Sequence, residues 1–128
     1  MSSKYILVEL SYYNMYIGFF NLIFNLHVDG YKIILAHPER YSYFHNKTNI
    51  YEDLKARGLY FQLNIISLSG YYSPIVKKTA EKLIDMGFYD FAGSDLHNMD
   101  YFFNFQKALY NPNLQKLIDS GKLKNHLL

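Results

Sequence analysis

An apolar segment that ends abruptly in polar residues constrains the fold of this 128-residue chain more than any other feature. Residues 33–36 form a short run rich in β-branched side chains, and His37, Pro38, Glu39 and Arg40 follow it directly. This pattern is typical of a buried strand whose carboxyl end carries polar groups. Active sites of α/β proteins lie at that end of their strands.

The same arrangement occurs twice more in the chain. The apolar run 5–8 is followed by Glu9, and the run 88–93 is followed by Ser94, Asp95, Leu96 and His97. Because parallel strands end at the same edge of a sheet, we expect Glu9, His37, Asp95 and His97 to meet at one mouth.

Strand and helix patterns alternate along the whole chain. Strands are expected over Tyr5–Leu10, Tyr31–Ala36, Leu59–Ile66 and Tyr89–Gly93, and helices over Met15–Val28, from Thr48 as N-cap to Gly58, from Pro74 to Gly87, and over Tyr101–Leu109 and Leu114–Ser120. This order predicts an α/β fold with parallel strands, and four strands are about half of a (β/α) barrel. No linker or repeat is visible, so we expect one domain over residues 1–128.

Composition excludes several classes of function. The chain has no Cys, which rules out a disulfide framework, a thiolate metal site and a cysteine-nucleophile phosphatase. The net charge is +2, and no dense Lys/Arg run indicates a nucleic-acid partner. No secretory signal is visible, and the most apolar stretch, 15–28, is shorter than the roughly 20 residues that span a bilayer. We therefore expect a soluble cytoplasmic protein.

The four polar strand-end residues suit a divalent metal. Such an ion needs imidazole and carboxylate donors converging within about 2.0–2.3 Å of one point. Asp95 and His97 leave an extended backbone on the same side, so both can face one ion. Arg40 suits a phosphate, because its planar guanidinium donates two parallel hydrogen bonds. Asn64 is expected to orient a ligand or water.

Each assignment has a structural alternative. A single His at a strand end is more often a hydrogen-bonded structural residue than a ligand, and Glu9 is also consistent with a solvated strand edge. Glu39 can pair with Arg40 or a backbone donor, and we assign it no catalytic role. His45 and the other two histidines outside these motifs are expected to be ordinary surface residues.

Four motifs together resemble a known superfamily. In order, 6–9, 35–41, 62–64 with 67–70, and 92–97 are similar to the C-terminal half of PHP-domain (polymerase and histidinol phosphatase) proteins, and most similar to the capsular-polysaccharide tyrosine-protein phosphatases of the YwqE or CpsB type. The match covers nearly the whole chain. It implies a partial (β/α) barrel with a divalent metal, Mn²⁺ ahead of Fe or Zn²⁺, bound by Glu9, His37, Asp95 and His97, and a phosphate-binding Arg40.

The resemblance also implies an activity. It is hydrolysis of phosphotyrosine in proteins during capsule or exopolysaccharide synthesis, with a capsule tyrosine kinase as one candidate substrate. The chain departs from the family in having no His-x-His on a first strand and in having Asp100 where a second phosphate-binding Arg is expected. Two interpretations remain, a truncated enzyme of low activity and a non-catalytic metal-binding or assembly module. Histidinol-phosphate hydrolysis fits the motifs less well.

A half barrel predicts association. Its two edge strands carry unpaired backbone groups and one sheet face is left apolar, which favours a homodimer or larger homo-oligomer. The alternative is a monomer in which the segment 101–128 folds back over the exposed face.

Overall fold

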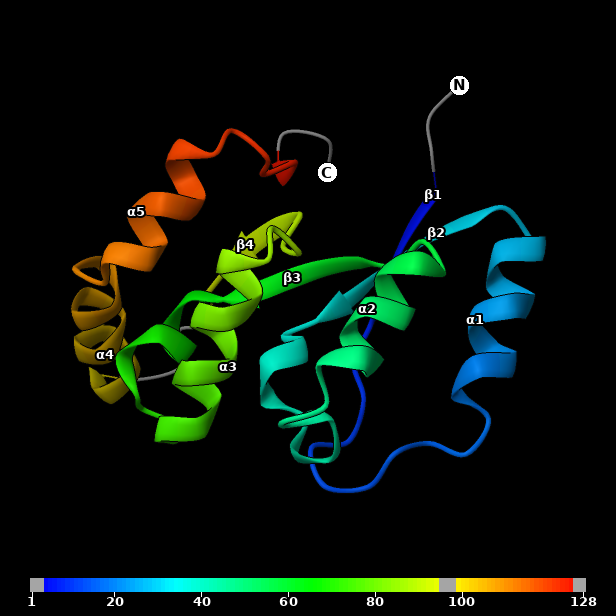
Figure 1. Cartoon of the computed structure of the whole chain (residues 1–128), viewed down its shortest axis with the longest axis horizontal. Helices are drawn as coiled ribbons and strands as arrows, with labels where there is room; N and C mark the ends of the chain where they lie inside the picture. The colour runs from blue at the N-terminus through cyan, green and yellow to red at the C-terminus, as the bar shows by residue number, and fades with distance from the viewer. Residues whose placement is uncertain (1–3, 95–98, 126–128) are drawn as a thin grey trace.

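Four short parallel strands in the order β1-β2-β3-β4 form the frame of the molecule (Figure 1). The computed structural model describes the backbone of residues 4–94 and 99–125, and the side chains of 4–94 and 103–125. The elements are β1 (Lys4–Val8), α1 (Phe19–Val28), β2 (Tyr31–Ala36), α2 (Thr48–Ala56), β3 (Tyr60–Asn64), α3 (Pro74–Asp85), β4 (Phe91–Gly93), α4 (Met99–Leu109) and α5 (Pro112–Asp119). Short 3₁₀ helices occupy Pro38–Arg40 (η1), Ser42–Phe44 (η2) and Ile65–Ser69 (η3). The predicted α/β half barrel with parallel strands is confirmed.

Alternation along the strands divides the sheet into two faces. One face, which we call the covered face, packs against the core cluster that includes the helix residues Phe19, Leu54 and Leu83. Its strand residues are Ile6, Val8, Ile33, Leu35, Phe61, Leu63 and Ala92. We call the open face the one that carries Tyr5, Leu7, Ile34, Ala36, Tyr60, Gln62, Phe91 and Gly93. Within the described residues, none of its side chains belongs to that cluster. The core therefore lies between the sheet and its helices.

The amino-terminal half of the open face is closed by aromatic rings of its own. The rings of Tyr5, Tyr60 and Phe91 lie 5.8–6.0 Å apart, centroid to centroid, across β1, β3 and β4. This cluster leaves Phe91 fully buried although it is outside the main core. These rings do not cover the carboxyl-terminal half of the open face, where the polar residues lie.

The first two helices begin differently from the prediction. Helix α1 begins at Phe19, not Met15, and its buried residues are Phe19 and Ile23, while Phe24 is 67% exposed. The reason is that α1 packs on β2 at one side of the sheet, so it needs only a narrow apolar stripe. Thr48 is the first residue of α2 and not its N-cap, because its hydroxyl accepts a hydrogen bond from Lys82 instead of capping the helix.

Three strands are shorter than predicted. Strand β1 spans Lys4–Val8 and ends two residues before the expected Leu10. Strand β3 ends at Asn64 because the Asn64 side chain accepts a hydrogen bond from the backbone N–H of Ile66 and so starts η3. Strand β4 begins at Phe91, two residues later than expected. Helix α3 begins as predicted at Pro74, because Ser73 caps it with a 3.1 Å hydrogen bond from Val76 N.

The last two helices pack against α3 and η3. Helix α4 packs on η3, and α5 packs on α3, so they stand beside α3 at the end of the molecule away from α1 (Figure 1). In the described residues these helices therefore do not cover the open face, contrary to the alternative, although Lys124 beyond α5 reaches that face with its Nζ 5.2 Å from the centroid of the Tyr60 ring. Beyond α5, Asn125 blocks the outer edge of β4, since its side-chain amide accepts from Ala92 N at 3.0 Å and donates to Ala92 O at 2.7 Å.

Candidate metal and phosphate site

Glu9 and His37 come together where their strands end. Each follows the last residue of its strand, and the two strands run side by side, with Val8 paired to Leu35. The Glu9 Oε1 and His37 Nε2 atoms lie 3.1 Å apart. Both residues line a cavity of about 270 Å³ at the carboxyl end of the open face, together with Leu7, Ala36, Gln62, Leu63, Asn64, Gly93 and Ser94.

An unusual backbone conformation directs His37 into this cavity. His37 is left-handed, with φ 33° and ψ 62°, a region that non-glycine residues rarely occupy. Its backbone N–H donates to Gln62 O at 2.8 Å, which continues the β2–β3 ladder by one residue, and Pro38 then begins η1. The chain thereby reverses at once after the strand. Strain of this kind persists where surrounding structure imposes it and is often associated with functional sites.

Arg40 reaches the same site through Tyr12. Arg40 Nη1 donates to the Tyr12 hydroxyl at 2.9 Å, and that hydroxyl donates to Glu9 Oε1 at 3.1 Å. The guanidinium also lies between two rings, with its Cζ 4.0 Å from the Tyr12 centroid and 3.6 Å from the Tyr72 centroid. Sequence analysis missed both tyrosines, because no motif distinguishes them from the other twelve in the chain.

Glu39 points the opposite way, into the protein. It is fully buried, and its carboxyl accepts hydrogen bonds from Tyr89 Oη at 2.7 Å, Ser67 Oγ at 2.7 Å and Asn64 N at 3.2 Å. Burial raises the pKa of this carboxyl, an effect that the hydrogen bonds from Ser67 and Tyr89 oppose. Glu39 thus ties η1 to β3, η3 and the segment before β4. Its partners are these donors and not Arg40, which had been one of the alternatives.

Asn64 and His45 brace this turn from two sides. The Asn64 side chain donates to the Tyr72 hydroxyl at 3.0 Å, so among the described contacts it orients a tyrosine of the site. His45 Nε2 lies 2.7 Å from the Glu39 carbonyl oxygen, and the residue is half-buried. The expectation that His45 is an ordinary surface residue is therefore wrong. Its place in the loop after η2 makes it a support for η1.

The donors that the structure describes suit a divalent ion in kind and spacing. Two ligands each about 2.1 Å from one ion are roughly 3 Å apart, close to the observed 3.1 Å between Glu9 Oε1 and His37 Nε2. His37 Nδ1 is buried and has no hydrogen-bond partner among the described residues. Within those residues, no group of three or more His, Asp or Glu side chains converges. Asp95 and His97 lie outside the described residues.

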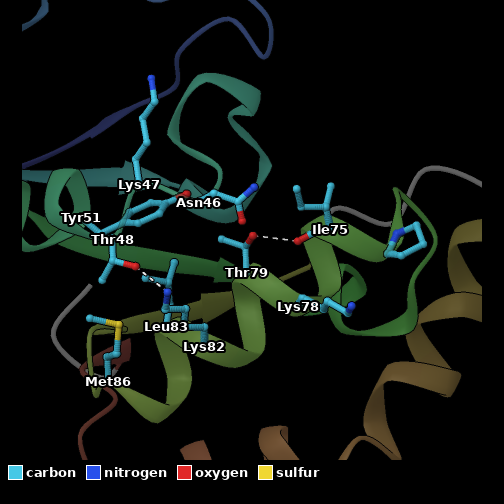
Figure 2. Close-up of a pocket in the computed structure, with 11 residues that line it drawn as sticks. Asn46, Lys47, Thr48, Tyr51, Ile75, Lys78, Thr79, Lys82, Leu83 and Met86 are labelled. Carbon is cyan, nitrogen blue, oxygen red and sulfur yellow. Dashed lines mark hydrogen bonds between the residues drawn. The ribbon is translucent and has the colours of Figure 1, made fainter.

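A second cavity lies on the other side of the sheet, between α2 and α3 (Figure 2). Its volume is about 360 Å³, and Lys47, Lys78 and Lys82 border it. Their ammonium groups do not converge, because Lys47 extends away from the cavity and Lys82 donates to Thr48 Oγ1 (Figure 2). The cavity therefore lacks the clustered donors that a phosphate requires.

Comparisons with known proteins agree on one family. The family described as capsular polysaccharide synthesis, CpsB/CapC, matches residues 1–104. The tyrosine-protein phosphatase YwqE of Bacillus subtilis is 29% identical over 84% of this chain and 43% of its own length, and the putative tyrosine-protein phosphatase CapC of Staphylococcus aureus is 28% identical over 94% and 51%. The tyrosine-protein phosphatase CpsB of Streptococcus pneumoniae is 28% identical over 77% and 42%.

Solved structures show the same similarity in three dimensions. A chain from the crystal structures of YwqE and CpsB, described as unique metal-dependent tyrosine phosphatases, aligns with a TM-score of 0.73 and 25% identity over 98% of this chain and 49% of that one. The present chain thus spans about half the length of the relatives it matches. In the part of the chain that the structure describes, no helix is both long and apolar enough to cross a membrane.

Proposed function

Because this chain belongs to the CpsB/CapC family of capsular polysaccharide synthesis proteins, we propose that its strand-end cavity takes part in metal-dependent hydrolysis of phosphotyrosine in proteins. The observation that carries the proposal is the connected set of Glu9, His37 and Arg40. The first two are 3.1 Å apart, and the Tyr12 hydroxyl joins both Glu9 and the guanidinium. A carboxylate and an imidazole beside a guanidinium is a donor set suited to a phosphate monoester on a divalent ion.

In this proposal Glu9 and His37 hold a divalent ion, with Asp95 and His97 as further ligands and Mn²⁺ as the expected metal ahead of Fe or Zn²⁺. The chemistry available from a bound ion is polarisation of a phosphoryl oxygen and acidification of water. Arg40 holds the phosphate through its remaining N–H groups and stabilises negative charge in the transition state. Glu39 keeps the turn rigid, so that His37 and Arg40 stay on the same side.

The substrate and partners follow from the same proposal. We expect a phosphotyrosine protein of capsule or exopolysaccharide synthesis, with a capsule tyrosine kinase as one candidate, and a cytoplasmic site of action. The open face, where Leu7 is 56% exposed at the β1 edge, is proposed to associate with a second copy. Light scattering at micromolar concentration checks this, and a monodisperse species near the 15.2 kDa chain mass would exclude it.

A non-catalytic metal-binding module is the second candidate, and one feature of the sequence favours it. Asp100 stands where the resemblance leads us to expect a second phosphate-binding Arg, and an acidic side chain there would repel a phosphate dianion. Such a module binds metal and leaves phosphotyrosine intact.

One pair of measurements separates these candidates. Metal binding is followed by titration calorimetry with Mn²⁺ between pH 5 and 8, where neutral imidazole is required for binding. Phosphate release from a phosphotyrosine peptide is followed in the same samples. The enzyme proposal expects slow, Mn²⁺-dependent release that His37→Ala abolishes and the control His27→Ala retains. Metal binding without release supports the module, and no binding at millimolar Mn²⁺ overturns both.

A further inference from the structure

Arg40 is held in place by aromatic rings and not by an acid. It lies half-buried, and within the described residues no carboxylate lies within ion-pair distance of its guanidinium. A buried or half-buried arginine is usually neutralised by such a partner. Here the contacts are the two ring faces, at 4.0 Å and 3.6 Å from Cζ, and the Tyr12 hydroxyl. The positive charge is thus positioned and left available for an anion.

We propose that Tyr12 and Tyr72 form an aromatic clamp that fixes the plane of the Arg40 guanidinium and thereby sets the affinity of the site for phosphate. This inference rests on the proposed function, because it assumes that Arg40 binds the phosphate. Neither tyrosine needs to touch the substrate. Both act through Arg40, as positioning residues.

The two rings of the clamp are held independently of each other. Tyr12, in the loop after β1, accepts hydrogen bonds at its backbone oxygen from Ser42 N at 3.1 Å and Ser42 Oγ at 3.0 Å. Its ring lies 5.3 Å from the His37 ring. These contacts tie one half of the clamp to the segment that follows the η1 turn.

Tyr72 comes from the loop between η3 and α3. Its hydroxyl accepts from Asn64 Nδ2 at 3.0 Å, and the residue precedes the Ser73 cap of α3. The Asn64 side chain is fixed in turn by its hydrogen bond from Ile66 N at 3.2 Å. Since the rings approach from separate loops and lie 4.0 Å and 3.6 Å from Cζ, the guanidinium is held from two parts of the chain.

This geometry determines which substitutions matter. The donors of a guanidinium lie in one plane, which suits two phosphate oxygens, and the contacts with the two rings and the Nη1 bond to Tyr12 fix the orientation of that plane. A lysine ammonium has no plane for the rings to fix. We therefore expect Arg40→Lys to lose most of the phosphate affinity although the charge is kept.

The test measures the affinity of the Mn²⁺-loaded full chain for inorganic phosphate by titration calorimetry. Tyr72→Leu removes one ring, and we expect about tenfold weaker phosphate binding, in line with a partly desolvated cation–π contact. Tyr12→Phe keeps the ring and loses the hydroxyl, with an expected loss of about threefold. Arg57→Ala is the matched control, because Arg57 also stacks on a ring, that of Phe20 at 4.6 Å, outside the cavity.

A double-mutant cycle separates positioning from general loosening. In the Arg40→Ala background, Tyr72→Leu should have no further effect on phosphate affinity, and in either background Mn²⁺ affinity should stay unchanged. If Arg40→Ala itself leaves phosphate binding intact, the phosphate site of the proposed function is wrong. If Arg40→Ala weakens binding and Tyr72→Leu does not, or if Tyr72→Leu acts equally in both backgrounds, the clamp is overturned while the site stands.

Discussion

The covered and open faces of the sheet belong to the same four strands, yet only the covered face is an ordinary protein core. On the covered face Leu35, Phe61 and Leu63 have no exposed surface, because the crossover helices lie over them. On the open face Leu7 is 56% exposed and the Glu9 side chain is 60% exposed. The helices therefore bury the covered face, whereas burial on the open face is confined to the inner strands and the aromatic cluster, and the polar strand ends gather where no helix covers the sheet.

The same division runs through the turn after β2. Pro38 and Glu39 are buried on the covered side, whereas His37 and Arg40 are directed to the cavity side. Neighbouring polar residues therefore have opposite tasks. Glu39 stabilises the fold, and Arg40 is placed for a ligand.

The largest expected effect comes from truncating a leucine on each face. Leu35→Ala should lower the free energy of unfolding by about 4 kcal/mol, because it leaves a cavity in a close-packed core. In the dissociated chain Leu7→Ala should cost less than about 1 kcal/mol, since half of that side chain is in solvent there. Chemical denaturation followed by circular dichroism measures both, at a protein concentration low enough to prevent the proposed association of the open face. Equal losses under those conditions would contradict the comparison.

The next comparison is between the effects on stability of truncating a buried glutamate, Glu39, and an exposed one, Glu52. Glu39→Ala should cost about 2–3 kcal/mol, because Tyr89, Ser67 and Asn64 lose their buried acceptor. Glu52→Ala, on the exposed side of α2, is the matched control and should change stability by less than about 0.5 kcal/mol. The same denaturation experiment applies, and a Glu39 variant as stable as the control would remove its structural role.

The sequence alone predicted the architecture well, for a physical reason. Apolar runs alternating with helical periodicity predict strand, helix and strand, and a helix that crosses over the sheet between two strands leaves them parallel. The sequence also predicted that Glu9 and His37 meet, because each follows a strand and parallel strands end together. Element boundaries were less predictable. Thr48 failed as an N-cap because its hydroxyl pairs with Lys82, a residue 34 positions away.

The rest of the site could not be predicted from the sequence, because it depends on contacts between residues far apart in the chain. Tyr12 and Tyr72 carry no local signal, since their role arises from two loops meeting on Arg40. Glu39 was left without a role because its partners Ser67 and Tyr89 are 28 and 50 residues away. Asp95 and His97 remain predictions, and metal-titrated variants of both are the direct way to check them.

The pH dependence of stability above pH 10 tests whether Tyr51 and Tyr89 are buried. Burial raises the pKa of Tyr51 and Tyr89 above the ordinary 10.0. Because the folded state holds these protons more tightly than the unfolded state, the stabilisation is complete below about pH 10 and is lost as the pH rises towards the folded values. The slope approaches about 1.4 kcal/mol per pH unit for each such tyrosine.

Unfolding measured from pH 8 to 12 checks this dependence. Tyr51→Phe should flatten the alkaline decline, at the cost of the hydrogen bond from its hydroxyl to Pro38 O. Tyr13→Phe is the control, because Tyr13 is 79% exposed, and it should leave the decline unchanged. A wild-type stability that stays flat above pH 10 would show that the buried phenols do not ionise on unfolding as argued.

The smallest expected effect on folding belongs to Glu9→Gln, which is also the sharpest test of the division between the faces. The Glu9 side chain is 60% exposed, and glutamine keeps an oxygen for the 3.1 Å hydrogen bond from Tyr12, so stability should change by less than about 0.5 kcal/mol. Mn²⁺ affinity should fall at least tenfold, because a neutral amide is a poorer ligand than a carboxylate. Calorimetric titration and denaturation on the same sample compare the two effects. A loss of stability with metal affinity preserved would reverse the assignment, making Glu9 a structural residue like Glu39 and leaving His37 without its partner at the site.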